Sequence, residues 1–183
     1  YNTIKNNIVN GDIYYHVVYE DNIVIENLTL NAQKVSNLGK ISIINSRNVT
    51  VKNLIISNSS GDGLLLYHSD ESNINNISSH SNSHGISLKD SSTNNTITNN
   101  LVSNNTNFGI YLDSSSNNNS ITNNTAWNNT GSIYSAGIYL NGASNNTITN
   151  NTALNNTQGI YLVTSSNNSI TNNIASNNSY GIR

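Results

Sequence analysis

The sequence predicts an all-β fold, a solenoid of about eight coils with roughly 22 residues in each coil. Two repeating patterns and one compositional bias lead to this prediction. A glycine followed by mostly apolar residues returns at nearly constant intervals, and so does an apolar residue placed two positions before an asparagine. Asparagine provides 43 of the 183 residues, and this residue is a poor helix former that favours turns. Short strands joined by tight turns fit all three observations.

The glycine pattern marks one strand in each coil from Gly63 onward. Successive glycines are 22, 24, 28, 22 and 22 residues apart. Alternation along a strand places the Ile and Leu positions inside the coil and the residues between them outside. The interval of 28 residues predicts a loop that bulges from an otherwise regular coil, near Gly131–Ser135. The segments are Gly63–Leu66, Gly85–Leu88, Gly109–Leu112, Gly137–Leu140, Gly159–Leu162 and Gly181–Ile182.

The second pattern predicts an internal asparagine ladder. An amide both donates and accepts hydrogen bonds, so identical asparagines one coil apart can bond along the solenoid axis. An unpaired interior amide costs about 1–3 kcal/mol, so Asn123→Ala is expected to destabilise the fold, whereas Asn118→Ala, in a loop, is not. The expected ladder consists of Asn6, Asn27, Asn53, Asn76, Asn99, Asn123, Asn150 and Asn172.

The repeat predicts a single domain over residues 1–183, with degenerate coils over 1–62 and regular coils over 63–183. Both ends of the sequence fit the repeat, whereas a solenoid usually ends in an atypical cap. We therefore expect either a piece of a longer repeat protein or self-association of open ends, with coils stacking between subunits into a filament or sheath.

Composition excludes several classes of partner. Only 9% of residues are charged and the net charge is −2, so no basic surface favours nucleic acid. No apolar run approaches the roughly 20 residues of a membrane span. Cysteine is absent, which excludes disulfides and thiolate ligands. The low charge and the repeats favour an extracellular or cell-surface location. The sequence starts at Tyr1, so we expect that a signal peptide was removed or lies outside this fragment.

The repeat unit resembles a known family. Its pattern, Gly-Ile-Tyr-Leu followed by Ser-Ser-Asn-Asn-x-Ile-Thr-Asn-Asn, is clearest over residues 63–183. It resembles the right-handed parallel β-helix repeats of carbohydrate-binding and sugar-hydrolase proteins. It is also similar to periplasmic β-helix proteins of copper-enzyme maturation and to archaeal cell-surface repeat proteins. The resemblance implies a right-handed parallel β-helix but no single function, because this solenoid hosts lyases, hydrolases, adhesins and scaffolds.

Three outward tyrosines form the first candidate site. Tyr111, Tyr139 and Tyr161 each lie two residues after the repeated glycine and stack in successive coils. Such an aromatic strip suits contact with a sugar ring or another protein. The alternative is that cross-strand tyrosine pairs only stabilise the sheet.

The second candidate site is an acidic edge formed by Asp70, Asp90 and Asp113. Paired carboxylates suit glycoside hydrolysis, but these residues are also ordinary turn residues in water. Residues 114–182 contain no acidic or basic side chain, which argues against acid–base chemistry there. Asp62 and His84 share a column one coil apart, yet two ligands do not make a metal site, so we expect no metal and no cofactor.

These observations favour a non-enzymatic structural β-helix protein of the cell surface. The first alternative is an adhesin-like carbohydrate-binding module that uses the tyrosine strip. A polysaccharide lyase or hydrolase would need the acidic edge. An ice-binding protein would use the regular outward hydroxyl pairs, which are Thr96 and Thr98, Ser120 and Thr122, Thr147 and Thr149, and Ser169 and Thr171.

Overall fold

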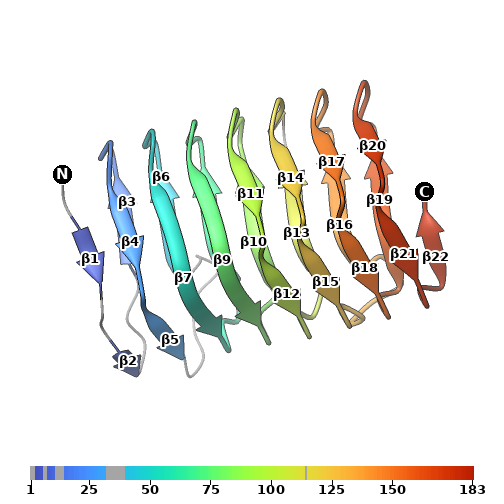
Figure 1. Cartoon of the computed structure of the whole chain (residues 1–183), viewed down its shortest axis with the longest axis horizontal. Helices are drawn as coiled ribbons and strands as arrows, with labels where there is room; N and C mark the ends of the chain where they lie inside the picture. Colours follow the sequence, from blue (N-terminus) through green and yellow to red (C-terminus); the bar gives the residue numbers. More distant parts are fainter. Residues whose placement is uncertain (1–2, 6–7, 11–14, 32–39, 114) are drawn as a thin grey trace.

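The computed structural model describes residues 3–5, 8–10, 15–31, 40–113 and 115–183. This part of the chain contains 22 short strands and no helix. The strands wind into a right-handed parallel β-helix of about seven turns, which confirms the predicted fold. Its coils lie side by side along one axis, and the first and last described strands lie at opposite ends of the rod (Figure 1).

The glycine segments form one parallel sheet, which we call sheet B. Its eight strands pair in the order in which the chain forms them, so that the seven intervals between them correspond to the turns of the helix. These strands are β3 (Tyr15–Val18), β6 (Ile41–Ile44), β8 (Asp62–Tyr67), β10 (His84–Lys89), β13 (Phe108–Asp113), β16 (Ala136–Asn141), β19 (Gln158–Val163) and β22 (Tyr180–Ile182).

The remaining strands form sheet A, which bends into two faces. The long strands β7 (Thr50–Ser57) and β9 (Asn73–His80) span both faces and join them. The first face also contains β1 (Thr3–Lys5), β4 (Val24–Glu26), β11 (Thr96–Thr98), β14 (Ser120–Thr122), β17 (Thr147–Thr149) and β20 (Ser169–Thr171). The second face also contains β2 (Ile8–Asn10), β5 (Thr29–Asn31), β12 (Leu101–Ser103), β15 (Thr125–Trp127), β18 (Thr152–Leu154) and β21 (Ile174–Ser176).

The core consists of apolar columns, one or two from each face. Identical positions in successive coils are paired in register, so each side chain packs on its counterparts above and below. Small side chains such as Ala126 and Ala153 fill the narrow second face. The buried columns include Ile86, Ile110, Ile138 and Ile160 in sheet B, and Ile97, Ile121 and Ile148 on the first face.

The repeated glycine is required by close packing between coils. A Cβ atom added to Gly109 would lie 2.5 Å from the carbonyl oxygen of Gly137 and 2.8 Å from Cγ2 of Val102. Real Cβ atoms do not approach other atoms so closely, and the neighbouring atoms are backbone and a branched side chain. The glycine column therefore allows sheet B to lie directly against the second face.

The predicted asparagine column is not the interior ladder, which corrects the register of that prediction. Its described members are exposed and have left-handed backbone angles, with φ between 54° and 57°; Asn6 lies outside the described residues. Each of these asparagines turns the chain at a corner. Some of them bond to one another on the surface: Nδ2 of Asn76 donates to Oδ1 of Asn53 over 2.9 Å, and Asn53 to Asn27 over 3.2 Å.

At the corner of the predicted column, the interior ladder lies one residue later, at the asparagines that follow Asn99, Asn123, Asn150 and Asn172. Asn100, for example, donates from its backbone N–H and from Nδ2 to Oδ1 of Asn124, and also from Nδ2 to the carbonyl of Ile74. Three such ladders run along the three corners of the helix. Their members are Asn95, Asn119, Asn146 and Asn168; Asn100, Asn124, Asn151 and Asn173; and Asn82, Asn105, Asn129, Asn156 and Asn178.

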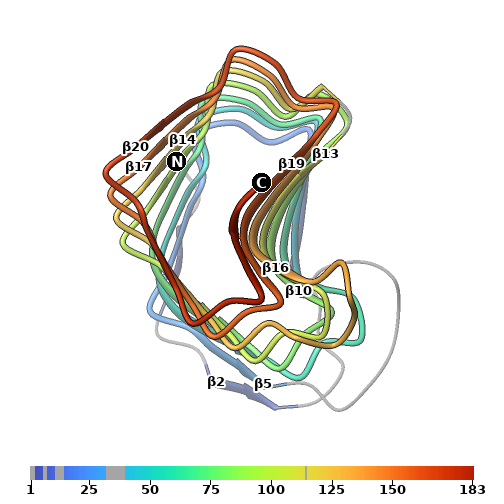
Figure 2. The same ribbon diagram turned by 90° about the vertical axis from the view of Figure 1, so that its right-hand side faces the viewer.

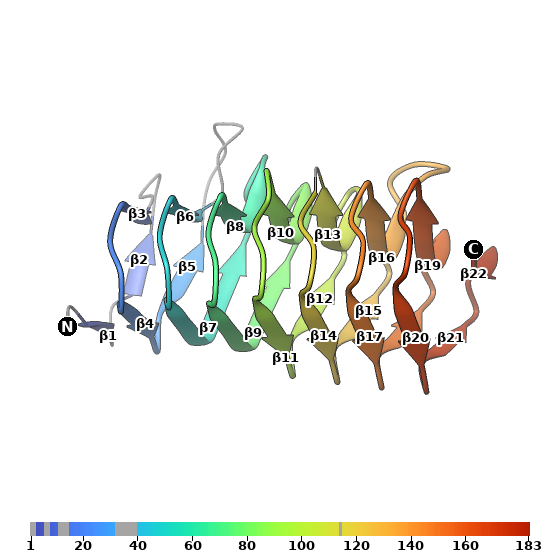
Figure 3. The ribbon, with the colours of Figure 1, turned by 90° about the horizontal axis from the view of Figure 1, so that it is seen from above.

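The predicted loop at Gly131–Ser135 is present between β15 and β16. Ser135 holds it in place, since Oγ of Ser135 donates to the carbonyl of Thr106 over 3.1 Å. Residues 131–134 are exposed, and the loop projects from the coils (Figure 3). Within the described residues, no helix is long and apolar enough to cross a membrane.

Candidate functional site

The outer face of sheet B is concave. Seen along the axis, the ribbon of sheet B bows toward the interior of the helix (Figure 2). Outward side chains on this face form three columns in register. The first column is Asp62, His84, Phe108, Ala136, Gln158 and Tyr180; the second is Ser87, Tyr111, Tyr139 and Tyr161; and the third is Lys89, Asp113, Asn141 and Val163.

A polar cluster centred on Asp62 occupies the N-terminal part of this face. The Asp62 carboxylate is only 2% exposed and accepts hydrogen bonds from three side chains of the next coil. Its Oδ1 is 2.7 Å from Nδ1 of His84 and 2.8 Å from Oγ of Ser87, and its Oδ2 is 2.9 Å from Nζ of Lys89. Asp62, His84 and Lys89 also line a pocket of about 180 Å³ together with Ser60, Gly61 and Ser83.

Electrostatics fix the protonation of the pair formed by Asp62 and His84. Burial raises the pKa of Asp62, but the hydrogen bond from His84 and the charge of Lys89 outweigh burial and hold this pKa below its ordinary value. Asp62 is therefore ionised at neutral pH and only accepts hydrogen bonds. Nδ1 of His84 must then carry the shared hydrogen, which leaves Nε2 as the second functional atom of the ring.

Aromatic rings continue the site along the axis. The His84 ring stacks on Phe108 with a centroid distance of 5.2 Å and lies 5.5 Å from the ring of Tyr111. Tyr111 and Tyr139 stack at 5.4 Å, and Tyr139 and Tyr161 at 5.2 Å. The predicted strip is thus a continuous row of rings that begins at His84. Burial, followed by the charge of Asp113, raises the pKa of Tyr111, so its hydroxyl stays protonated.

The acidic edge is divided among separate partners. Oδ1 of Asp70 accepts hydrogen bonds of 2.8 Å from the backbone N–H and the hydroxyl of Thr93. Asp90 pairs with His68 at 3.8 Å, and Asp113 bonds to Tyr111. Asp70 and Asp90 are therefore engaged in local contacts with Thr93 and His68. Of the three carboxylates, only Asp113 belongs to the concave face.

Sequence reasoning placed Asp62 beside His84 but missed Lys89 and Ser87. Ser87 and Lys89 alternate with the buried Ile86 and Leu88, so the sequence already indicated that both face outward. Alternation alone would place His84 on the inner side with Ile86, and the constellation was therefore not predicted. The concave curvature of sheet B brings their side chains to the carboxylate, and curvature was not predicted from the repeat.

A family described as periplasmic copper-binding protein (NosD) matches the chain over residues 1–136 and 30–183. Copper sites use thiolate, thioether or imidazole ligands, and this chain has no cysteine and no methionine. Its histidines have other partners or lie apart: His84 bonds to Asp62, and His80 to Ser81. No group of three or more His, Asp or Glu residues converges within the described part of the chain, so these residues do not fit a copper site.

Solved structures of similar fold include several enzymes. A variant of the periplasmic alginate epimerase AlgG matches with a TM-score of 0.74 and 21% identity, covering 83% of this chain and 36% of its own. The A-module of the mannuronan C-5 epimerase AlgE6 of Azotobacter vinelandii matches with a TM-score of 0.65 and 14% identity, covering 99% and 54%. The alginate lyase of Paenibacillus sp. str. FPU-7 matches with a TM-score of 0.55 and 11% identity, covering 98% of both chains.

These likenesses show a shared fold, and this chain spans about a third of the length of AlgG. They contradict the prediction of a non-enzymatic protein, which rested on the scarcity of charge, because neighbours with this β-helix fold are an epimerase, a lyase and a DFA-IIIase. A search of curated proteins found none that matches. The family match extends over the whole sequence, and the chain belongs to the NosD family of β-helix proteins.

Proposed function

We propose that this chain binds a polysaccharide along the concave outer face of sheet B and performs acid–base chemistry on it at His84. One observation carries the proposal: the buried Asp62 carboxylate orients His84 at the beginning of a row of aromatic rings. An alginate epimerase, a mannuronan C-5 epimerase and an alginate lyase share this fold, and this supports alginate as the first substrate to test.

The aromatic row supports binding. A tyrosine ring offers an apolar face to the C–H groups of a sugar and a hydroxyl to its polar groups. From Tyr111 to Tyr161 the row has one tyrosine per coil, with ring centroids 5.4 Å and 5.2 Å apart, so it follows the axis over two coil spacings. A linear polymer lying along the axis meets one ring after another.

The pair formed by Asp62 and His84 supports proton transfer. Asp62 accepts the Nδ1 hydrogen and stabilises the imidazolium that forms when Nε2 takes a proton from the substrate. Lys89 bonds the other carboxylate oxygen and balances its charge. His84 is thus the proposed base, and Asp62 and Lys89 are positioning residues. The family description and the AlgG neighbour support a site of action outside the cytoplasm.

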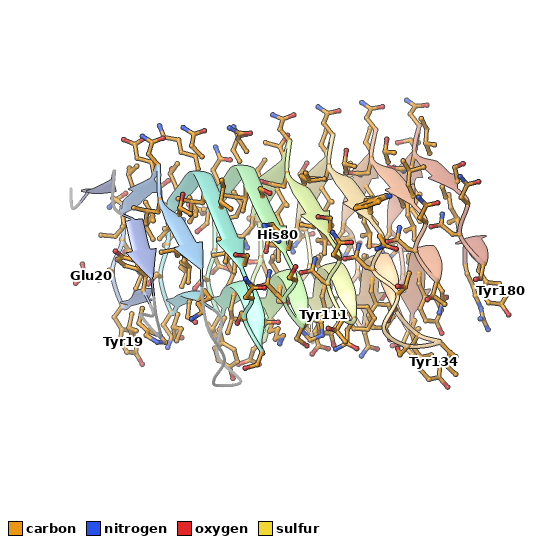
Figure 4. The ribbon with its side chains drawn as sticks, turned by 90° about the horizontal axis from the view of Figure 1, so that it is seen from below. Tyr19, Glu20, His80, Tyr111, Tyr134 and Tyr180 are labelled. Atoms are coloured by element: carbon orange, nitrogen blue, oxygen red, sulfur yellow. The ribbon has the colours of Figure 1, made fainter. Side chains whose placement is uncertain are left out.

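Turnover tests the acid–base part. Purified protein is incubated with alginate and with neutral polysaccharides in D₂O, and cleavage and deuterium incorporation are followed by NMR. We expect turnover that His84→Gln lowers at least 100-fold. His80→Gln is the matched control, because His80 lies on β9, on another face (Figure 4), and this variant keeps full activity. Equal rates for the two variants contradict the role of His84.

Retention on polysaccharide gels tests the binding part. Tyr139→Ala is expected to weaken binding about tenfold, because it interrupts the row of rings. Tyr19→Ala removes an exposed ring outside this row and is expected to have no effect. If the protein binds polysaccharide but shows no turnover, the proposed binding surface is supported and the proposed acid–base chemistry is wrong. End-to-end self-association remains a prediction from the sequence.

A further inference from the structure

A second pocket lies on the C-terminal part of the same side of the helix. It has a volume of about 570 Å³ and forms where the loop at Gly131–Ser135 meets the last two coils. The labelled side chains of Tyr134 and Tyr180 lie on this part of the molecule, beyond Tyr111 (Figure 4). The pocket is lined by Ile133, Tyr134, Thr157, Gln158, Ser179, Tyr180 and Arg183.

Gln158 gives this pocket a hydrogen-bond acceptor that has no partner within the described structure. The residue belongs to the first outward column of sheet B, three strands after His84, and is only 1% exposed. Its Nε2 donates to the carbonyl of Ile133 over 3.3 Å, whereas its Oε1 has no hydrogen-bond partner within the described structure. A buried acceptor is normally paired. Gln158 lines the pocket, so its unpaired oxygen is the acceptor nearest to a ligand hydroxyl bound there.

Arg183 gives the pocket a positive charge. Its guanidinium lies 5.4 Å from the ring of Tyr180 and 5.5 Å from the ring of Tyr161. Residues 114–182 contain no acidic side chain, and no salt bridge of Arg183 occurs in the described part of the chain. The planar guanidinium therefore offers its fork of N–H donors to a carboxylate from outside the protein.

Two exposed aromatic rings form the walls. Tyr134 is 61% exposed and Tyr180 is 54% exposed. Arg183 touches both the Tyr180 wall and Tyr161, the last ring of the aromatic row, so the pocket and the row are continuous. A ligand that follows the row reaches the guanidinium next.

We propose that this pocket is a second sugar subsite, which binds a carboxylate-bearing sugar unit. Arg183 binds the carboxylate, Oε1 of Gln158 accepts a sugar hydroxyl, and Tyr134 and Tyr180 pack on the ring. This inference rests on the proposed function, because both sites bind one polymer. Gln158 is three coil spacings from His84, about 14 Å at 4.8 Å per coil, so only an oligosaccharide of several units fills both sites.

Calorimetry on the His84→Gln background, which prevents turnover, tests the subsite. The probes are an oligoalginate of six units, one of two units, and a neutral cello-oligosaccharide of six units. We expect the acidic hexamer to bind more tightly than the other two. Arg183→Gln is expected to lower the affinity for the acidic hexamer about tenfold and to make this affinity less dependent on salt. Arg183→Lys restores part of the lost affinity. Gln158→Leu lowers the affinity for the acidic hexamer severalfold. Arg47→Gln is the control: Arg47 is a cation that does not line this pocket, and its loss leaves the affinity for the acidic hexamer unchanged.

The outcomes separate the two proposals. If the acidic hexamer binds equally to the Arg183→Gln variant and its parent while Tyr139→Ala weakens it, the subsite is wrong and the binding surface stands. If the neutral and acidic hexamers bind with equal affinity, the assignment of a carboxylate-bearing unit is wrong. If the parent binds none of the three probes, the proposed function fails and the subsite fails with it.

Discussion

Asn123 and Asn124 are neighbours in the chain but lie on opposite sides of one corner of the helix. Asn123 is exposed and has a left-handed backbone with a φ of 57°. Asn124 is 1% exposed; its Nδ2 donates to the carbonyl of Ile97 over 2.8 Å and to Oδ1 of Asn151 over 3.0 Å. The first asparagine therefore turns the chain, and the second pairs the backbone groups that the turn leaves without partners.

The two asparagines should respond differently to substitution. Asn124→Ala leaves the backbone N–H of Asn100 and the carbonyl of Ile97 unpaired in the interior, so we expect a loss of at least about 2 kcal/mol. Asn123→Gly keeps the left-handed turn and is expected to change stability by less than about 0.5 kcal/mol. Thermal and urea unfolding of both variants measure the difference. Equal losses contradict the division of roles at the corner.

The glycine column makes a second prediction about stability. Gly109→Ala places a Cβ 2.5 Å from the carbonyl oxygen of Gly137, and the coils must separate to accommodate it. We expect a loss of about 1–3 kcal/mol, measured by the midpoint of thermal unfolding. Gly142→Asn is the control: Gly142 has a φ of 66°, a Cβ added there would meet no atom within 4 Å, and asparagine tolerates this angle. A Gly109→Ala variant as stable as the parent contradicts close packing between the coils.

Asp62 makes stability depend on pH. Because its pKa in the folded chain lies below the ordinary value, its contribution is present above the unfolded pKa of about 3.9 and is lost as the pH falls through the folded pKa. Unfolding curves measured from pH 6 to pH 2 should therefore show an acid-induced loss of stability that is smaller in Asp62→Asn. Glu20→Gln is the control: Glu20 is exposed, and this variant should lose as much stability at acidic pH as the parent does. The same loss in Asp62→Asn and the parent would show that this carboxylate is not held ionised by His84 and Lys89.

The donor set predicts weak copper binding in spite of the family description. His84 already shares its Nδ1 hydrogen with Asp62, and the chain supplies no sulfur ligand. Titration with Cu²⁺ under calorimetry should show no stoichiometric site with micromolar or tighter affinity. One tightly bound copper ion per chain, lost in His84→Gln, would contradict this account of the site.

The sequence predicted the columns of the helix well, because a strand alternates with a period of two and every coil repeats the same residues. This is why the glycine, isoleucine and leucine columns pair in the expected register. The asparagine ladder was predicted one residue too early, because alternation was extended through the corner. At Asn99 the left-handed φ of 56° reverses the side that the next residue faces, so Asn100 points inward.

The candidate site was predicted only in part, for a similar reason. Register alone pairs Asp62 with His84, since they occupy the same position in successive coils. Lys89 reaches Asp62 from the opposite end of its strand, which requires the concave shape of sheet B and a long flexible side chain. Neither curvature nor side-chain reach follows from a repeat pattern.

The most direct test of the central claim is a crystal structure of the His84→Gln variant with an alginate oligosaccharide. The account predicts sugar density along the concave face of sheet B, over Tyr111, Tyr139 and Tyr161, with one sugar unit next to position 84. Sugar bound on either face of sheet A, or a crystal soaked at saturating oligosaccharide in which the face of sheet B holds none, would contradict it.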